Sequence, residues 1–93
     1  MMLSEAYENV EDGNFDDALK LYDSALKIDP TNSNIYVDKG ATLQNMGRLK
    51  LAIRSFDKAL SISPENIDAL LNKGATLHSE QKYYKAIECY DDV

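Results

Sequence analysis

The sequence repeats itself with a period of 34 residues. Residues 39–43 read KGATL and return as residues 73–77, which read the same. A step of the same length backward pairs Phe56 with Tyr22 and Pro64 with Pro30. A fixed period of this length is typical of stacked supersecondary units, none of which can bury its apolar face alone. The sequence therefore predicts a tandem array.

Each unit carries the same pattern of small and aromatic residues when Ser33 is counted as a first position. The small residues and the aromatic residue recur at Ala6, Gly40 and Gly74, at Ala18, Ala52 and Ala86, and at Tyr22, Phe56 and Tyr90. On these residues the chain resembles the tetratricopeptide repeat (TPR) family, whose 34-residue unit is a helix-turn-helix. The resemblance implies an all-α fold, a right-handed α-solenoid of antiparallel helix-turn-helix repeats with six helices. The whole chain, residues 1–93, would form one domain with units 1–32, 33–66 and 67–93.

Apolar spacing and turn residues place the expected helices. Residues at intervals of three and four predict helices near 2–12, 16–28, 34–46, 50–62, 67–80 and from 83 onward. Gly13 and Gly47 suit the turns within units one and two, whereas Gln81 stands at the equivalent place in unit three. The expected core of units two and three consists of Tyr36, Leu43, Ile53, Phe56, Leu60, Leu70, Gly74 and Leu77.

The third unit stops at its twenty-seventh position, before the proline that ends the other two units. We expect the chain to be a fragment of a longer repeat protein, or its last helix to pair with another molecule. The apolar side chains that this end would expose are candidates for self-association as a homodimer: Tyr83, Ile87, Tyr90 and Val93.

The resemblance implies a function in binding proteins. In this family the first helix of each unit lines a concave groove that holds a partner peptide or helix. The matching positions here are Leu3, Tyr7, Val10, Asn34, Val37, Asp38, Ala41, Gln44, Asp68, Leu71, Asn72, Ala75 and His78. The alternative is an architectural or oligomerisation segment of a longer superhelix.

The groove positions also predict which partner binds. Members that clamp the acidic C-terminus of a chaperone use Lys, Arg and Asn at positions that hold Leu3, Tyr7, Asp38, Asp68 and Asn72 here. None of these is cationic, and two carboxylates would repel an acidic tail. An apolar or basic segment is therefore the expected partner.

Charge and composition limit the other function classes. The formal net charge is −6, which gives no electrostatic case for nucleic-acid binding. No apolar run is long enough for a membrane span, and the single cysteine fits a reducing compartment, so a cytoplasmic protein is expected. The second unit is the only basic one, with Arg48, Lys50, Arg54 and Lys58 predicted on a solvated outer face.

Catalytic and metal sites find little support in the sequence. Cys89 and His78 are the only candidates for a thiol nucleophile and its histidine base, and no third group orients them. The aspartates of residues 12–23 resemble a calcium loop faintly, but they lack its glycine and its final glutamate. We therefore expect no enzyme activity and no cofactor.

Overall fold

The computed structural model describes the backbone of residues 14–91 and the side chains of residues 14–85. This part of the chain contains four helices and no strand: α2 (Phe15–Ile28), α3 (Ser33–Asn45), α4 (Leu49–Ile62) and α5 (Ile67–Asp91). The predicted helix at 2–12, with its groove candidates Leu3, Tyr7 and Val10, lies outside the described residues. So does Val93.

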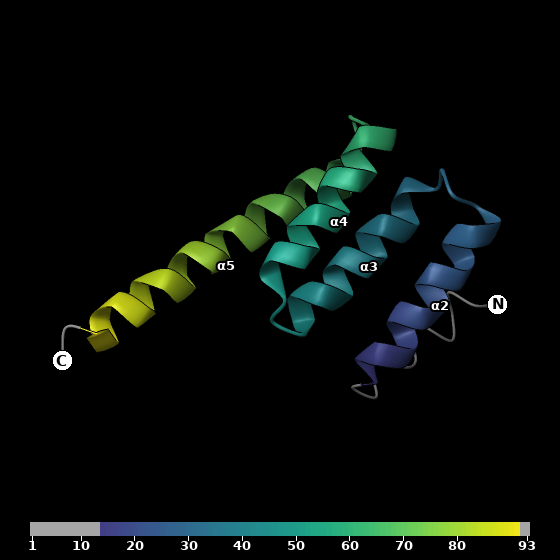
Figure 1. The fold of residues 1–93 in the computed structure, drawn as a ribbon. Helices are drawn as coiled ribbons and strands as arrows, with labels where there is room; N and C mark the ends of the chain where they lie inside the picture. The colour runs from purple at the N-terminus through teal and green to yellow at the C-terminus, as the bar shows by residue number, and fades with distance from the viewer. Residues whose placement is uncertain (1–13, 92–93) are drawn as a thin grey trace.

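Successive helices run antiparallel and pack in chain order (Figure 1). The helix α3 contacts α2 and α4, and it also contacts α5, so the first helices of units two and three are neighbours. Prolines follow α2 and α4 at Pro30 and Pro64, where a ring without an N–H cannot continue a helix. The predicted boundaries of α2, α3 and α4 agree with the structure to within one residue at each end.

The turn between α3 and α4 depends on Gly47. Its φ of +79° lies in the left-handed region that glycine adopts without steric cost. The N–H of Arg48 donates to the carbonyl of Leu43 at 2.9 Å, which closes a Schellman-type cap and ends α3. This hydrogen bond lets α4 reverse direction directly after α3.

The predicted break in the third unit is wrong, because α5 is one helix of 25 residues. Gln81 occupies the position that Gly47 holds one repeat earlier, and a non-glycine residue in the left-handed region costs ~1–2 kcal/mol. Nothing in the local sequence therefore ends the helix near residue 81. The second half of α5 extends away from the other helices (Figure 1).

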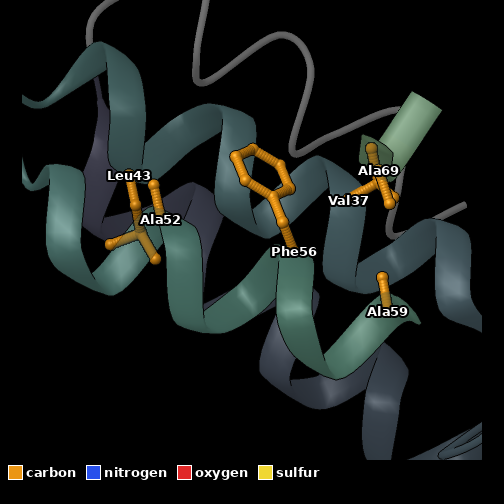
Figure 2. Close-up of a cluster of buried hydrophobic side chains, with 6 residues drawn as sticks. All are labelled: Val37, Leu43, Ala52, Phe56, Ala59 and Ala69. Carbon is orange, nitrogen blue, oxygen red and sulfur yellow. The ribbon is translucent and has the colours of Figure 1, made fainter. Parts of the chain in front are cut away.

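The core lies between α3 and α4 and extends to the start of α5. Phe56 is fully buried and is surrounded by Val37, Leu43, Ala52, Ala59 and Ala69 (Figure 2). A second cluster joins α2 to α3 through Ala18, Tyr22, Ala25 and Ile35. Small alanines on α2 and α4 let the backbones approach, and the rings of Tyr22 and Phe56 fill the remaining space.

The core predicted for unit three is not formed. Leu70 and Leu77 are about half exposed, and Gly74 is exposed. In unit two, the equivalent Gly40 is covered by the ring of Phe56. In unit three the equivalent aromatic, Tyr90, lies sixteen residues further along the same continuous helix, roughly 24 Å away at 1.5 Å per residue. The residues that would cover Leu70 and Leu77 therefore do not reach them.

Polar contacts between units repeat with the same period. Lys39 Nζ contacts Asp23 Oδ1 at 2.7 Å, and Lys73 Nζ contacts Asp57 Oδ1 at 2.5 Å. Each pair joins the second helix of one unit to the first helix of the next. All four groups are partly exposed, so each pair contributes only ~0.2–1 kcal/mol. Because the two ion pairs occupy equivalent positions, they favour the same arrangement of helices at the α2–α3 and α4–α5 contacts.

We predict opposite effects for alanine at the two equivalent glycines. A Cβ at Gly40 would lie 2.5 Å from Phe56 Cε1, whereas a Cβ at Gly74 meets nothing within 4 Å. Gly40→Ala should lower the free energy of unfolding by ~1–3 kcal/mol through overpacking. Gly74→Ala should raise it by ~0.5–1 kcal/mol through helix propensity.

The measurement is urea unfolding followed by circular dichroism, at a protein concentration at which light scattering gives a monomer. Destabilisation by both substitutions would contradict the open, continuous α5, because it would mean that residue 74 is covered in the monomer.

Candidate functional site

The candidate binding surface is formed by α3 and α5 side by side, and we call it the α3–α5 face. The predicted groove residues of α5 fall on one side of that helix, because Asp68, Leu71, Asn72, Ala75 and His78 are three or four residues apart. Those of α3, from Asn34 to Gln44, follow the same spacing. The structure therefore brings the groove candidates of units two and three onto neighbouring helices.

Asn66 joins the beginnings of these two helices. Its side-chain amide donates to Ser33 Oγ at 3.0 Å and to Asn34 Oδ1 at 3.1 Å. Its own Oδ1 accepts from the N–H of Ala69 at 3.2 Å and so caps the first turn of α5. Asn32, one repeat earlier, caps α3 in the same way by accepting from the N–H of Asn34. The side chain of Asn66 thus links the first turn of α5 to the first turn of α3.

The α3–α5 face is apolar in places and carries carboxylates at both helices. Leu71 is 67% exposed, and Ala75 and His78 are exposed beside it on α5. Asp68 is exposed, and Asp38 is half-buried on α3. Asn34 is exposed, whereas Ala41, Gln44 and Asn72 are half-buried.

Val37 differs from the other groove candidates. It is only 6% exposed and packs in the core cluster with Phe56, Ala59 and Ala69. Its side chain supports the α3–α5 contact and is not available to a partner in this structure. The spacing of groove positions predicts which side of α3 holds Val37, but it could not show how closely α5 approaches there.

A buried polar contact lies beneath the face, between α2 and α3. Tyr22 and Thr42 are almost fully buried, and the Thr42 hydroxyl donates to the carbonyl of Asp38 at 3.0 Å. Burial raises the pKa of the Tyr22 phenol above its ordinary value of 10.0. The hydrogen bond with Thr42 opposes this rise in pKa, and the nearby charge of Asp38 adds to it.

Tyr83 is the one self-association candidate whose side chain the structure describes. Tyr83 is 62% exposed and meets Tyr84 edge to face, with ring centroids 6.0 Å apart. Tyr83 lies seven and fourteen residues after Thr76 and Ala69, which are both fully buried, so it continues the packed side of α5. There it lines a small hollow with Leu49 and Lys50 at the start of α4. The side chains of Ile87 and Tyr90 lie outside the described residues.

No group of histidine, cysteine and acidic side chains in the described part of the chain could hold a metal ion. Likewise, no helix within residues 14–91 combines the length and the apolar character needed to span a bilayer.

Comparison with protein families finds three overlapping matches. A TPR repeat model matches residues 6–47, and two tetratricopeptide repeat models match residues 33–66 and 55–91. Together they extend over residues 6–91, with about three units. The chain belongs to the tetratricopeptide repeat family.

Repeats of the TPR family mediate protein–protein interactions and are not themselves enzymes. No curated protein matches this TPR chain. The family assignment therefore supports a role in binding proteins, and the choice of partner has to be argued from the surface.

We predict that the parent protein loses stability above pH 10 and that the Tyr22→Phe variant does not show this loss. In the unfolded chain a tyrosine phenol ionises near pH 10, whereas the raised pKa keeps the buried Tyr22 protonated to higher pH. Above pH 10 the unfolded state therefore binds fewer protons than the native state, and the free energy of unfolding falls as pH rises.

Urea unfolding from pH 7 to 11 would measure this difference. Below pH 9 the variant should be less stable by a constant amount, ~1 kcal/mol for the lost hydrogen bond. Above pH 10 the difference in the free energy of unfolding between parent and variant should become smaller. A gap that stays constant through pH 11 would contradict the assignment of the raised pKa to Tyr22.

Proposed function

We propose that the chain is a protein-interaction scaffold that holds an apolar or basic partner segment on the α3–α5 face. The observation that carries this proposal is Leu71, a large apolar side chain 67% exposed between Asp68 and Ala75. Covering a leucine with a partner contributes ~1.5–3 kcal/mol when burial is complete. No packing role in the described structure accounts for its position.

The carboxylates of the face favour one sign of partner charge. Asp68 and Asp38 lie on the two helices that form the face. They would attract lysine or arginine in a bound segment and repel an acidic one. An apolar anchor over Leu71 with basic residues beside it fits this surface.

We predict that Leu71→Ala weakens partner binding without destabilising the fold. The probes are fluorescein-labelled twelve-residue peptides with identical apolar residues and with either four lysines or four aspartates. The lysine peptide should bind, and Leu71→Ala should reduce its affinity about tenfold, equivalent to ~1.4 kcal/mol of lost apolar contact.

Ile28→Ala is the matched control, because Ile28 is 75% exposed at the end of α2, away from the face. Exposed substitutions of this kind change stability by less than ~0.5 kcal/mol, so both variants should unfold like the parent. An equal loss of binding in the two variants would overturn the proposal. So would an aspartate peptide that binds the parent and loses affinity in the Leu71→Ala variant.

A second candidate function is self-association through α5, and it is favoured by the open space at Gly74. In unit two the ring of Phe56 lies against Gly40. At the equivalent Gly74 of unit three, a Cβ added to the backbone would have no atom within 4 Å. A second copy could supply residues 82–91 of its own α5, whose Tyr90 corresponds to Phe56. Reciprocal exchange of this segment would complete the third unit in both copies.

We expect multi-angle light scattering over a hundredfold range of concentration to show a dimer. Gly74→Ala should shift the equilibrium toward the monomer, because the added methyl group fills the space for the incoming ring. The control is Ala75→Ser, because Ala75 is an exposed neighbour of Gly74. Gly47→Ala is not suitable, since it would strain the turn between α3 and α4. A monomer at every concentration would exclude this second function.

A further inference from the structure

A hollow of about 400 Å³ opens between α2, α3 and α4, and we call it the α2–α4 pocket. On α3 it is lined by Tyr36, Lys39 and Leu43, which lie on the side of the helix roughly opposite Asp38 and Ala41. The pocket therefore shares no residue with the α3–α5 face. Leu19 and Asp23 come from α2, and Arg48, Leu51, Arg54, Ser55 and Lys58 come from α4 and the residue before it.

The rim of this pocket is strongly basic in an acidic chain. Four cationic side chains and one carboxylate line it, an excess of three positive charges, whereas the chain as a whole carries −6. Asp23 is already paired with Lys39. Arg48, Arg54 and Lys58 are exposed and form no ion pair with any described residue. Three cations thus lie at the pocket without an ion-pair partner among residues 14–85.

The floor of the pocket is apolar. Leu43 is buried at its base, and Leu19 and Tyr36 are half-buried beside it. Leu51 is 43% exposed and adds a further apolar side chain to the lining. An apolar floor beneath a cationic rim suits a ligand that carries both an apolar group and anionic groups.

We propose that the α2–α4 pocket docks an acidic segment of a partner protein, with one leucine-sized side chain on the floor and carboxylates on the rim. The guanidinium groups of Arg48 and Arg54 each offer a planar set of donors that fits a carboxylate. Lys58 adds a third cation further along α4. The negative charge over the remainder of the chain disfavours a nucleic acid, which would have to approach that charge along its length.

The pocket lets one short scaffold bind two segments of opposite charge. The α3–α5 face presents carboxylates, and the α2–α4 pocket presents cations on the other side of α3. The two sites would hold their ligands at the same time, since no residue is shared. The pocket can be tested whether or not the face binds its own partner.

Fluorescence polarisation with a labelled nine-residue peptide of alternating aspartate and leucine tests the proposal on the full chain. The peptide should bind in 50 mM salt and bind more weakly in 300 mM salt. The double substitution Arg48→Gln and Arg54→Gln should reduce its affinity at least tenfold. Leu51→Ala should reduce it severalfold, and a peptide with serine in place of leucine should bind weakly to the parent.

The matched control is the double substitution Lys20→Gln and Lys27→Gln. It removes the same two positive charges from exposed positions on α2 that do not line the pocket. It should leave the affinity within about twofold of the parent. An equal loss of peptide affinity in the two double variants would overturn the proposal, because it would show that binding depends on net charge alone. A twelve-nucleotide single-stranded DNA that binds as well as the peptide, with the same loss on Arg48 and Arg54 substitution, would also overturn it.

Discussion

The contact between the ring of Phe56 and the backbone of Gly40 is the interaction on which the pairing of helices within a unit depends. The space beside Gly40 is filled by the ring so completely that a single added methyl group would lie 2.5 Å from it. This close approach is possible only because the residue on α3 has no side chain. It brings α3 close to α4 at this point, where Ala52 and Ala59 are also fully buried.

Contacts between units depend on a different set of residues, which repeats with the same period. The ion pairs Lys39–Asp23 and Lys73–Asp57 join equivalent helices, and Asn66 links the start of α5 to the start of α3. None of these contacts is strong by itself. Because each occurs at the same place in successive units, they favour one register between neighbouring units. That register places the two proposed binding surfaces on opposite sides of α3.

The third unit shows what happens when one half of the repeated interaction is missing. Its sequence retains the glycine at 74 and the aromatic at 90, but Gln81 replaces the glycine that reverses the chain in unit two. The helix therefore continues, and Leu70, Gly74 and Leu77 lose the neighbours that their counterparts have. The same repeat pattern thus has two outcomes, since the pairing of helices needs the turn as well as the packing residues.

The sequence by itself determined the family, the helical class, the boundaries of α2, α3 and α4, and which residues share a side of each helix. These properties follow from local spacing, turn residues and a repeat that can be read along the chain. The tertiary structure decided that α5 does not bend, that Val37 is buried while Leu71 is exposed, and that Tyr36 and Leu51 join Arg48 and Arg54 around one pocket. Burial and pocket formation depend on how closely separate helices approach. Spacing within one helix identifies the side on which a residue lies, but only the packing of α2, α3, α4 and α5 determines what lies opposite it.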